Sequence, residues 1–333
     1  MTLKRLADAL GVHASTVSRA LDPRRRTLVA PDVAEKIRAA ADRLGYRPDP
    51  IAASLRTRRS RLIGVLVPDI ANPVFSPIIG GIAGALSRAG YALVVADAGI
   101  DGARQTDMAE RLIAQRVDGL ILATASRDDA LVERCRVRRL PVVLVNRAAD
   151  DDRVPAIVSD DMAGMALVVE HLAALGHRRI GHIAGPAHLS TGHLRRRGFE
   201  AAMRAPADAI ETASAFTREA GEVAAAALLA RHPDLTAIVA ANDLLALGTY
   251  GAARARGLRC PTDISITGHN DMPLVDLVDP PLTTVRIEHR AMGAHAAEAV
   301  LTMLDDGATR PESLRLAPSL VLRGSTAAAR EAD

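Results

Sequence analysis

The chain has 333 residues, 49% of them hydrophobic, and carries a formal net charge of +3. This length favours two or three domains, and no apolar run is long enough to cross a bilayer. Cys135 and Cys260 lie far apart without a metal-ligand spacing, so they predict neither a disulfide framework nor a zinc site, and both are expected to be buried fillers. The start, MTLKRLADALG, lacks the continuous apolar stretch of an export signal, so a cytoplasmic protein is expected.

Charge is distributed unevenly along the chain. Residues 1–61 hold 14 Lys and Arg against 6 Asp and Glu, whereas the remainder holds 28 basic and 33 acidic residues. A concentrated positive field on a short segment is typical of a polyanion-binding module, because neutralised phosphates release counterions. The run PRRRT taken alone is equally well explained as a solvated surface.

A helical head is predicted at the N-terminus. Apolar residues recur at helical spacing from Leu3 to Leu10, Gly11 ends that helix, and a second periodic run follows His13. Two short helices joined by a tight glycine turn predict a helix-turn-helix, whose second helix enters the DNA major groove. A third helix is expected from about Pro31 to Leu44.

From Leu62 onward, strand-like runs such as LIGVLVP, YALVVAD, GLILAT and PVVLVN alternate with helical patterns. The layout repeats with RIGHIAG, AIVAAN and ISITGHN, which predicts two α/β lobes with parallel sheets. Helices are expected near 76–89, 103–115, 195–203, 244–256 and 292–304, and a last strand near Leu320. Ligands of such sheets bind outside the carboxyl ends of the strands. The polar positions there are 69–75, Asp97, Asn146, Asn242 with Asp243, and Asn270 with Asp271.

Many ordered motifs give the chain a specific resemblance. TVSRAL, LGYRPD, NPVF, RVDGLIL, LPVVLVNR, AANDLLALG and DPPLTTVR follow one another, and the chain resembles the lactose/galactose repressor (LacI-type) family over nearly its whole length. The resemblance implies an α/β fold: an N-terminal helix-turn-helix three-helix DNA-binding head and a two-lobed, periplasmic-binding-protein-like body with parallel sheets. It implies a head at 1–46, a hinge helix or linker at 47–60, and an effector-binding and dimerisation domain at 61–333, with lobe 1 at about 61–159 and 290–318 and lobe 2 at about 160–289 and 319–333.

The resemblance also implies which residues meet DNA. The base-reading pair falls on Ala14 and Ser15, with an arginine at Arg19, and Leu55 occupies the position of a leucine that enters the minor groove. Alternatively, Leu55 packs against its dimer mate. The full set expected at DNA is Leu3, His13, Ala14, Ser15, Thr16, Ser18, Arg19, Arg25 and Leu55.

Two departures from the family concern helix caps. His13 and Ala30 replace the usual serines before the second and third helices, and each replacement is expected to lose a cap of about 1 kcal/mol. The loop between these helices is unusually basic, so Arg24, Arg25 and Arg26 are hypothesised to contact phosphates.

An effector is expected between the lobes. By position, the residues expected to bind it are Asn72, Phe75, Asn146, Arg195, Phe216, Asn242 and Asn270. Phe75 and Phe216 could instead be core residues. Asn146 and Asn270 stand where sugar-binding relatives often carry Asp, and Ile287 and His289 replace other residue types near the crossing strand. Two ligand classes stay open: a neutral sugar or polyol held by amides, or an anionic ligand paired with Arg195.

The predicted function is a sequence-specific DNA-binding transcriptional regulator, most simply a repressor, controlled by a sugar or related metabolite. It is expected to bind near-palindromic double-stranded operator DNA as a homodimer, with the helix near 74–89 and its Gly80, Gly81 and Gly84 at the interface. The terminal STAAAREAD is too short and polar for a tetramerising coiled coil.

Two rival classes were weighed. An enzyme is disfavoured because His171, His177 and His182 have neither metal-pair nor nucleophile–base spacing, and no phosphate-cradling glycine motif follows a strand. No cofactor, metal or membrane is predicted. The remaining alternative is a solute-binding receptor without a DNA role, which would not need the basic head.

Overall fold

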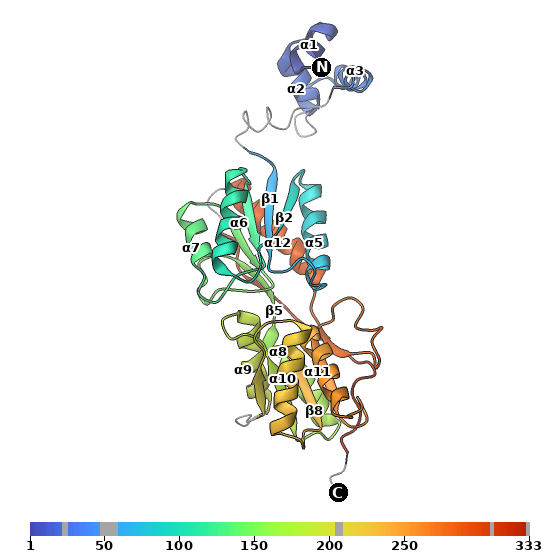
Figure 1. The fold of residues 1–333 in the computed structure, drawn as a ribbon. Coiled ribbons are helices and arrows are strands. Elements are labelled where there is room, and N and C mark those ends of the chain that lie inside the picture. Colours follow the sequence, from blue (N-terminus) through green and yellow to red (C-terminus); the bar gives the residue numbers. More distant parts are fainter. Residues whose placement is uncertain (22–25, 47–58, 204–208, 307–309, 331–333) are drawn as a thin grey trace. The chain divides into compact units, whose positions relative to one another are not determined.

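The structure is a computed structural model that describes residues 1–21, 26–46, 59–203, 209–306 and 310–330. Contacts divide the chain into a head, Met1–Ser60, and a body, Arg61–Asp333, whose elements are labelled in Figure 1. The expected class, a three-helix head and an α/β body with two parallel sheets, is confirmed.

The head is built from three helices and one short 3-10 turn. They are α1 (Leu3–Leu10), α2 (Ala14–Leu21), η1 (Arg26–Leu28) and α3 (Pro31–Arg43). Gly11 adopts φ 62° and ends α1, a left-handed conformation that glycine takes without steric cost. Leu6 from α1, Val17 from α2 and Ile37 from α3 are at most 1% exposed and form the centre of the core. Each helix therefore keeps one apolar face inside and the other face in solvent.

The body contains two six-stranded sheets. The first has the order β11-β5-β4-β3-β1-β2, with all neighbours parallel, and the second has the order β12-β10-β9-β8-β6-β7, with only β12 antiparallel. The strands are β1 (Leu62–Val67), β2 (Ala92–Asp97), β3 (Gly119–Leu122), β4 (Val142–Val145), β5 (Ala156–Ser159), β6 (Ile180–Ala184), β7 (Ile210–Thr212), β8 (Ala237–Ala240), β9 (Ser265–Asn270), β10 (Thr283–Arg286), β11 (Leu314–Leu316) and β12 (Ser319–Val321).

Helices cover both faces of each sheet (Figure 1). Around the first sheet are α5 (Phe75–Arg88), α6 (Gly102–Ala114), α7 (Ala130–Val137) and α12 (His289–Asp306). Around the second sheet are α8 (Asp161–Ala174), α9 (Ser190–Met203), α10 (Arg218–Arg231) and α11 (Asp243–Ala255). Central strands such as β3 and β8 are buried along their whole length, as expected for parallel strands sandwiched between helices. Helices α7, α8 and α10 lie outside the ranges in which the sequence predicts helices.

The chain crosses between the two sheets after β5, after β10 and after β11. Each sheet is therefore completed by segments distant in sequence: α12 packs on the first sheet, and β12 joins the second. Because the strands of each sheet are parallel, their carboxyl ends gather polar loop residues at one edge of that sheet.

Helices α5 and α12 approach each other closely through two glycines. A Cβ added at Gly81 would lie 2.2 Å from the carbonyl oxygen of Arg290, and one added at Gly293 would lie 2.0 Å from that of Ile78. Gly81 thus allows α5 and α12 to pack closely within the chain, and its place at an interface between protomers stays a prediction. Gly84 lies on the exposed side of α5 and has only the Arg88 side chain within 4 Å.

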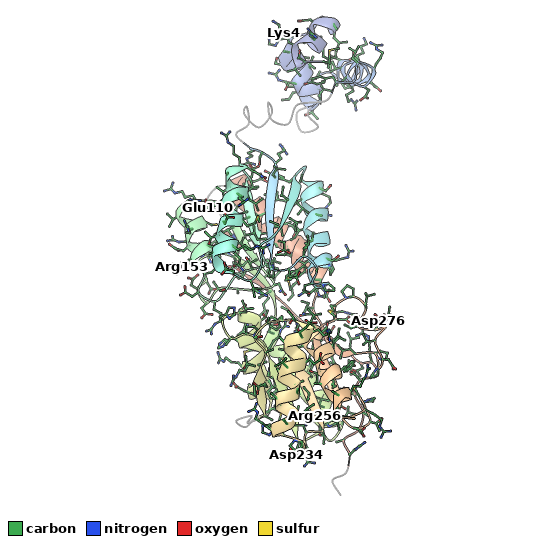
Figure 2. All side chains as sticks on the ribbon, in the orientation of Figure 1. Lys4, Glu110, Arg153, Asp234, Arg256 and Asp276 are labelled. Carbon is green, nitrogen blue, oxygen red and sulfur yellow. The ribbon has the colours of Figure 1, made fainter. Side chains whose placement is uncertain are left out.

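Several ion pairs lie on the surface of the body (Figure 2). Glu110 accepts from Arg138 at 2.6 Å, and Arg153 pairs with Glu133 at 3.0 Å. Such solvent-exposed pairs contribute little to stability, about 0 to 1 kcal/mol each. Among the described residues, no helix combines the length and the apolar character needed to span a membrane.

The two cysteines differ in environment. Cys135 is 1% exposed, and burial raises the pKa of its thiol to about 11. Cys260 is only half-buried, and its Sγ donates to the carbonyl oxygen of Ser325 at 3.4 Å. The expectation of a buried filler is therefore confirmed for Cys135 and wrong for Cys260, because the turn before β9 leaves that side chain at the edge of the second core.

Candidate functional site

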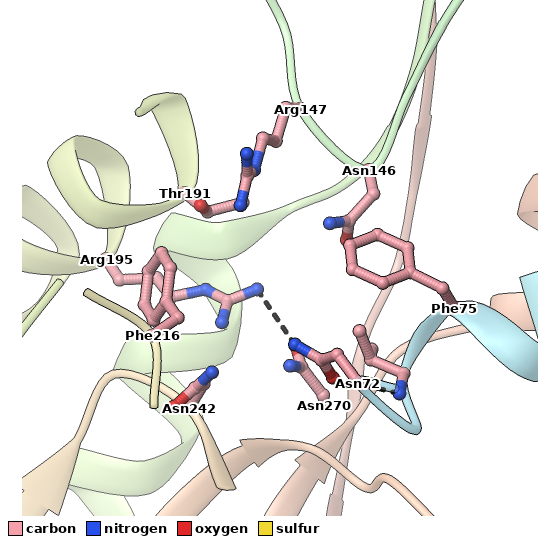
Figure 3. A pocket seen from close by; sticks show the side chains of 10 residues that line it. Asn72, Phe75, Asn146, Arg147, Thr191, Arg195, Phe216, Asn242 and Asn270 are labelled. Carbon is pink, nitrogen blue, oxygen red and sulfur yellow. Dashed lines mark hydrogen bonds between the residues drawn. The ribbon is translucent and has the colours of Figure 1, made fainter. Parts of the chain in front are cut away.

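A cavity with about 300 Å³ of empty space, part of it open to solvent, lies between the two sheets of the body (Figure 3). The lining side chains come from loops and helix starts that follow strands of both sheets: Asn72, Val74, Phe75, Asn146, Arg147, Thr191, Arg195, Phe216, Asn242 and Asn270.

Every residue expected from the sequence to bind the effector lies on this cavity, and three further residues, Val74, Arg147 and Thr191, also line it. Two of the three carried a signal in the sequence. Arg147 directly follows the strand-end residue Asn146, and Thr191 stands four residues before Arg195, a spacing that places both on one helix face.

Other polar residues at strand ends form hydrogen bonds and ion pairs within the fold. Asp97 accepts from the backbone N–H groups of Ile70, after β1, and Gly99, after β2. Asp271 pairs with Arg286 and Arg323 at 2.7 and 2.6 Å. Asp243 is fully buried and accepts from the Thr284 hydroxyl at 2.5 Å. The expectation that these three aspartates line the pocket is wrong, because each finds donors within its own sheet. Ile287 and His289 are also outside the lining.

Arg195 lies at the floor of the cavity, and each of its three guanidinium nitrogens donates one hydrogen bond. Its Nε donates to Oδ1 of Asp161 at 2.8 Å, Nη1 to the carbonyl oxygen of Ala241 at 2.7 Å, and Nη2 to Oδ1 of Asn270 at 3.1 Å. The side chain is 2% exposed. The network ties α8, α9, β8 and β9 together, so it holds the pocket's floor rigid.

Four asparagines present amides to the cavity (Figure 3). Asn242 caps α11, accepting from the N–H of Leu245 at 2.9 Å, and Asn72 accepts from the N–H of Val74 at 3.2 Å, so both amides are held in place. Asn146 and Asn270 adopt positive φ values of 65° and 119°. Asparagine tolerates the left-handed region better than most residues, which suits it to these sharp strand ends.

Two aromatic rings line the cavity from opposite sheets. Phe75 begins α5 and is 2% exposed, whereas Phe216 precedes α10 and is half-buried. Phe216 lies directly over Gly185, where a Cβ would come within 2.2 Å of its ring. A glycine at position 185 is therefore what allows the ring of Phe216 to occupy its place.

Arg147 is the second arginine of the cavity and is 7% exposed. Burial, together with the charge of Arg195, lowers the pKa of its guanidinium to about 10. Its Nε has no hydrogen-bond partner among the described residues, in contrast to Arg195. The side chain remains charged at neutral pH.

In the head, the DNA-contact candidates lie on or beside α2. Arg19 and His13 are exposed, and Ser15, Thr16 and Ser18 are half-buried. Leu3 and Ala14 pack partly against the core of the head, so each presents only part of its side chain to a ligand. Arg25 and Leu55 lie outside the described residues, as do Arg24 and the side chain of Arg26.

The start of α2 has a cap that the sequence analysis did not expect. The Nδ1 atom of His13 accepts from the backbone N–H of Ser15 at 3.2 Å and lies 2.8 Å from the Ser15 hydroxyl. A ring nitrogen can therefore replace the usual serine oxygen, and the expectation of a lost cap is wrong for His13. It is confirmed for Ala30, which precedes α3 without a side-chain cap.

The histidines singled out in the second lobe have structural partners. His171 bonds to Thr326 at 3.0 Å, His177 bonds to Thr236 at 2.9 Å, and His182 Nδ1 donates to the carbonyl oxygen of Val239 at 2.8 Å. Over the described part of the chain, no cluster of three or more His, Cys, Asp or Glu could hold a metal ion.

Comparison with known proteins places the chain in a family. Residues 60–322 match the family described as "Periplasmic binding proteins and sugar binding domain of LacI family". The HTH-type transcriptional regulator MalR of Streptomyces coelicolor is 37% identical over 98% of this chain and 97% of its own. The lac repressor dimer bound to operator and the anti-inducer ONPF superposes with a TM-score of 0.85 at 29% identity, covering 98% of this chain and 99% of that chain. The CelR–cellobiose complex superposes with a TM-score of 0.75 at 30% sequence identity, covering 98% of this chain and 99% of that chain.

A helical head and a body with a polar cavity between two parallel sheets define a DNA-binding transcriptional regulator under effector control, and not an enzyme. The chain belongs to the LacI family.

Proposed function

We propose that this regulator is a repressor whose affinity for operator DNA is set by a polyhydroxylated effector, a sugar or a derivative, bound in the cavity between the two sheets. The observation that carries the proposal is the convergence of amides, two arginines and two aromatic rings from both sheets on one cavity. Amides, guanidinium groups and an apolar ring face are the groups that hold sugars. CelR is a relative named in complex with cellobiose, which supports this ligand class.

The cavity suggests how binding reaches the head. Asn72, Phe75 and Asn146 lie in loops and a helix start beside the first sheet. Arg195, Phe216 and Asn242 lie in loops and a helix beside the second sheet, so a ligand touching both sets favours one arrangement of the sheets. A ligand can shift a two-state equilibrium only by its differential affinity for the two states. By reciprocity, operator binding changes effector affinity by the same factor.

The DNA contacts are proposed for α2 and its start. Arg19, which is exposed, is proposed to contact a guanine edge or a phosphate, and Thr16 and Ser18 are proposed to contact phosphate oxygens. The Ser15 hydroxyl, which lies 2.8 Å from His13 Nδ1, keeps acceptor capacity for a base. Leu3, His13 and Ala14 frame this surface, and Arg25 and Leu55 complete the proposed set.

A homodimer on a near-palindromic operator is proposed, with each head reading one half-site. The lac repressor is named as a dimer bound to operator, which supports this arrangement. We propose residues 1–46 as the reading head, 47–60 as the hinge and 61–333 as the effector-binding and dimerising body. The site of action is the cytoplasm, where the DNA is.

The first test is a salt titration of the full chain binding to fluorescent duplexes from the region upstream of its own gene, against scrambled duplexes. Preferential binding to one upstream duplex with a steep salt slope supports the proposal. Arg19→Ala should lower the specific affinity about tenfold or more, whereas Lys36→Ala, an equal loss of charge on the exposed side of α3, should change it less than threefold.

A solute receptor without a DNA role would behave differently. It would bind upstream and scrambled duplexes equally weakly, even in a selection from random duplexes with metabolites present, and Arg19→Ala would change nothing. That result would overturn the repressor and leave ligand binding by the cavity untouched.

A further inference from the structure

Arg147 is a nearly buried cation that has no partner among the described residues. Its side chain is 7% exposed and lines the cavity, with its guanidinium beside Thr191 (Figure 3). No hydrogen bond or ion pair joins this side chain to any described residue, and its Nε is buried without a partner. An arginine kept for packing alone would be expected to find carbonyl or carboxylate acceptors, as Arg195 does at 2.7 to 3.1 Å.

The charges around the cavity do not balance. The charge of Arg195 is compensated by Asp161, whose Oδ1 lies 2.8 Å from its Nε. None of the ten lining residues is acidic. Asp243, next in sequence to the lining residue Asn242, accepts hydrogen bonds from the Thr284 hydroxyl and from the N–H of Met272. The described walls therefore leave one positive charge, that of Arg147, without a counter-charge.

Burying an isolated charge is unfavourable because water is replaced by a less polar surrounding, and buried charges in proteins are normally paired. Burial lowers the pKa of Arg147 to about 10, which still leaves the group protonated at neutral pH. A ligand that brings a negative charge would remove this penalty, and its charge-assisted bonds would be stronger than those to a neutral hydroxyl.

We propose that the effector carries one anionic group, a carboxylate or a phosphate monoester, which binds against the guanidinium of Arg147 with the Thr191 hydroxyl beside it. The inference rests on the proposed function of the cavity and names its ligand class. The hydroxylated remainder of the ligand is held by the asparagine amides between Phe75 and Phe216. Arg195 is paired with Asp161 and donates from each of its three nitrogens to Asp161, Ala241 and Asn270, so it orients the floor of the site and is not the anion's main partner.

The test compares matched neutral and anionic ligands on the full chain by calorimetry and thermal shift. Suitable pairs are glucose with glucuronate, galactose with galacturonate, and glucose or ribose with its terminal phosphate ester, so that carboxylate and phosphate are separate arms. The variant is Arg147→Gln, which removes the charge and keeps an amide donor. The control is Arg153→Gln on the same β4–β5 segment, where the arginine is exposed and paired with Asp151 and Glu133.

At least one anionic member is expected to bind tenfold or more tightly than its neutral partner. Arg147→Gln should abolish that preference, and Arg153→Gln should preserve it. Inorganic phosphate or sulfate replacing chloride at equal ionic strength should raise the melting temperature of the wild type by more than that of Arg147→Gln. The ligand-free Arg147→Gln protein should melt at or above the wild-type temperature, because it no longer buries an unpaired charge.

Several results would overturn the inference. One is a neutral sugar that binds as tightly as its anionic partner, with an affinity lowered by Phe216→Ala and untouched by Arg147→Gln. In that case the cavity is still the effector site and only the anionic class is wrong. Binding that neither variant affects would overturn the cavity as the effector site as well. A complete lack of response to the anionic panel and to both oxyanions, or a melting temperature of Arg147→Gln well below wild type, would also refute the inference.

Discussion

The Nε of Arg195 lies 2.8 Å from Oδ1 of Asp161, and both side chains are less than 5% exposed. This pair joins the first turn of α8 to the floor of the cavity, where the guanidinium also donates to Asn270. Burial raises the pKa of the Asp161 carboxyl, and the positive charge of Arg195 acts in the opposite sense. Because the pair is desolvated, each partner depends on the other.

Asp161→Asn is expected to be strongly destabilising, since it leaves the Arg195 charge buried and uncompensated. Loss of one partner of a buried pair lowers the free energy of unfolding by about 3 to 5 kcal/mol. Denaturant titration measures this change. Asp107→Asn, which breaks the exposed pair of Arg111 and Asp107, should lower it by no more than about 1 kcal/mol. Equal losses in the two variants would mean that the buried pair is not a stabilising contact.

Gly185→Ala is expected to push the Phe216 ring out of its place and to weaken ligand binding, because the new Cβ would lie 2.2 Å from the ring. The effect should disappear when Phe216 is already leucine, since a smaller, flexible side chain can move away. A double-mutant cycle on ligand affinity measures this coupling. If the two substitutions add independently, Gly185 is not what positions the ring.

His13→Ala should lower the stability of the head by about 1 kcal/mol, because the N–H of Ser15 loses its acceptor at the start of α2. His13→Ser should retain most of that stability by supplying a hydroxyl acceptor. Amide exchange at Ser15 and thermal unfolding of the head transition provide the two readouts. Faster exchange in both variants would show that the ring has no capping role that serine can take over.

Gly293→Ala should destabilise the body by several kcal/mol, because the added methyl would meet the carbonyl oxygen of Ile78 at 2.0 Å and force α12 away from α5. Gly84→Ala is the matched control, since it adds the same methyl to the exposed side of α5. It should be neutral or raise stability by up to about 1 kcal/mol through helix propensity. A tolerated Gly293→Ala would argue against a close crossing of these helices.

His182 makes stability depend on pH. Its ring is fully buried and stacks on Phe199 at 4.7 Å, and burial lowers its pKa to about 4 against the opposing bond to Val239. As the pH falls, His182 is therefore protonated in the unfolded chain before it is protonated in the folded chain. Its contribution to the free energy of unfolding is intact above about pH 6.5 and is lost as the pH falls toward 4. The slope due to one such group is at most about 1.4 kcal/mol per pH unit.

The corresponding measurement compares the free energy of unfolding of wild type and His182→Gln between pH 7.5 and 5.5. The variant should lose less stability on acidification than the wild type. Taking the difference matters because Asp243, whose pKa burial raises to about 7, acts in the opposite sense over the same range. If the free energies of unfolding of the two proteins fall in parallel with pH, His182 takes up its proton as readily in the folded chain as in the unfolded chain.

Much of the fold could be predicted from the sequence because it depends on local periodicity. The runs that became β1, β4 and β8 are continuous apolar stretches, and α1 to α3 show helical spacing with Gly11 as a stop. The positions of Asn72, Asn146, Asn242 and Asn270 followed from one rule, that parallel strands present their carboxyl ends at the same edge. Strand-end polarity alone could not separate these asparagines from Asp97, Asp243 and Asp271.

The tertiary structure decided which polar groups are already satisfied. Asp243 and Asp271 find donors inside their own sheet, and Arg195 finds Asp161, a residue 34 positions earlier in the chain. Arg147 finds no acceptor among the described residues, although the sequence shows it as one arginine among many. By itself, the sequence determined the order of the elements that were expected, since these follow from patterns a few residues long, whereas α7, α8 and α10 were recognised only in the structure. The partners of buried charges depend on packing between distant segments, and that packing exists only in the folded chain.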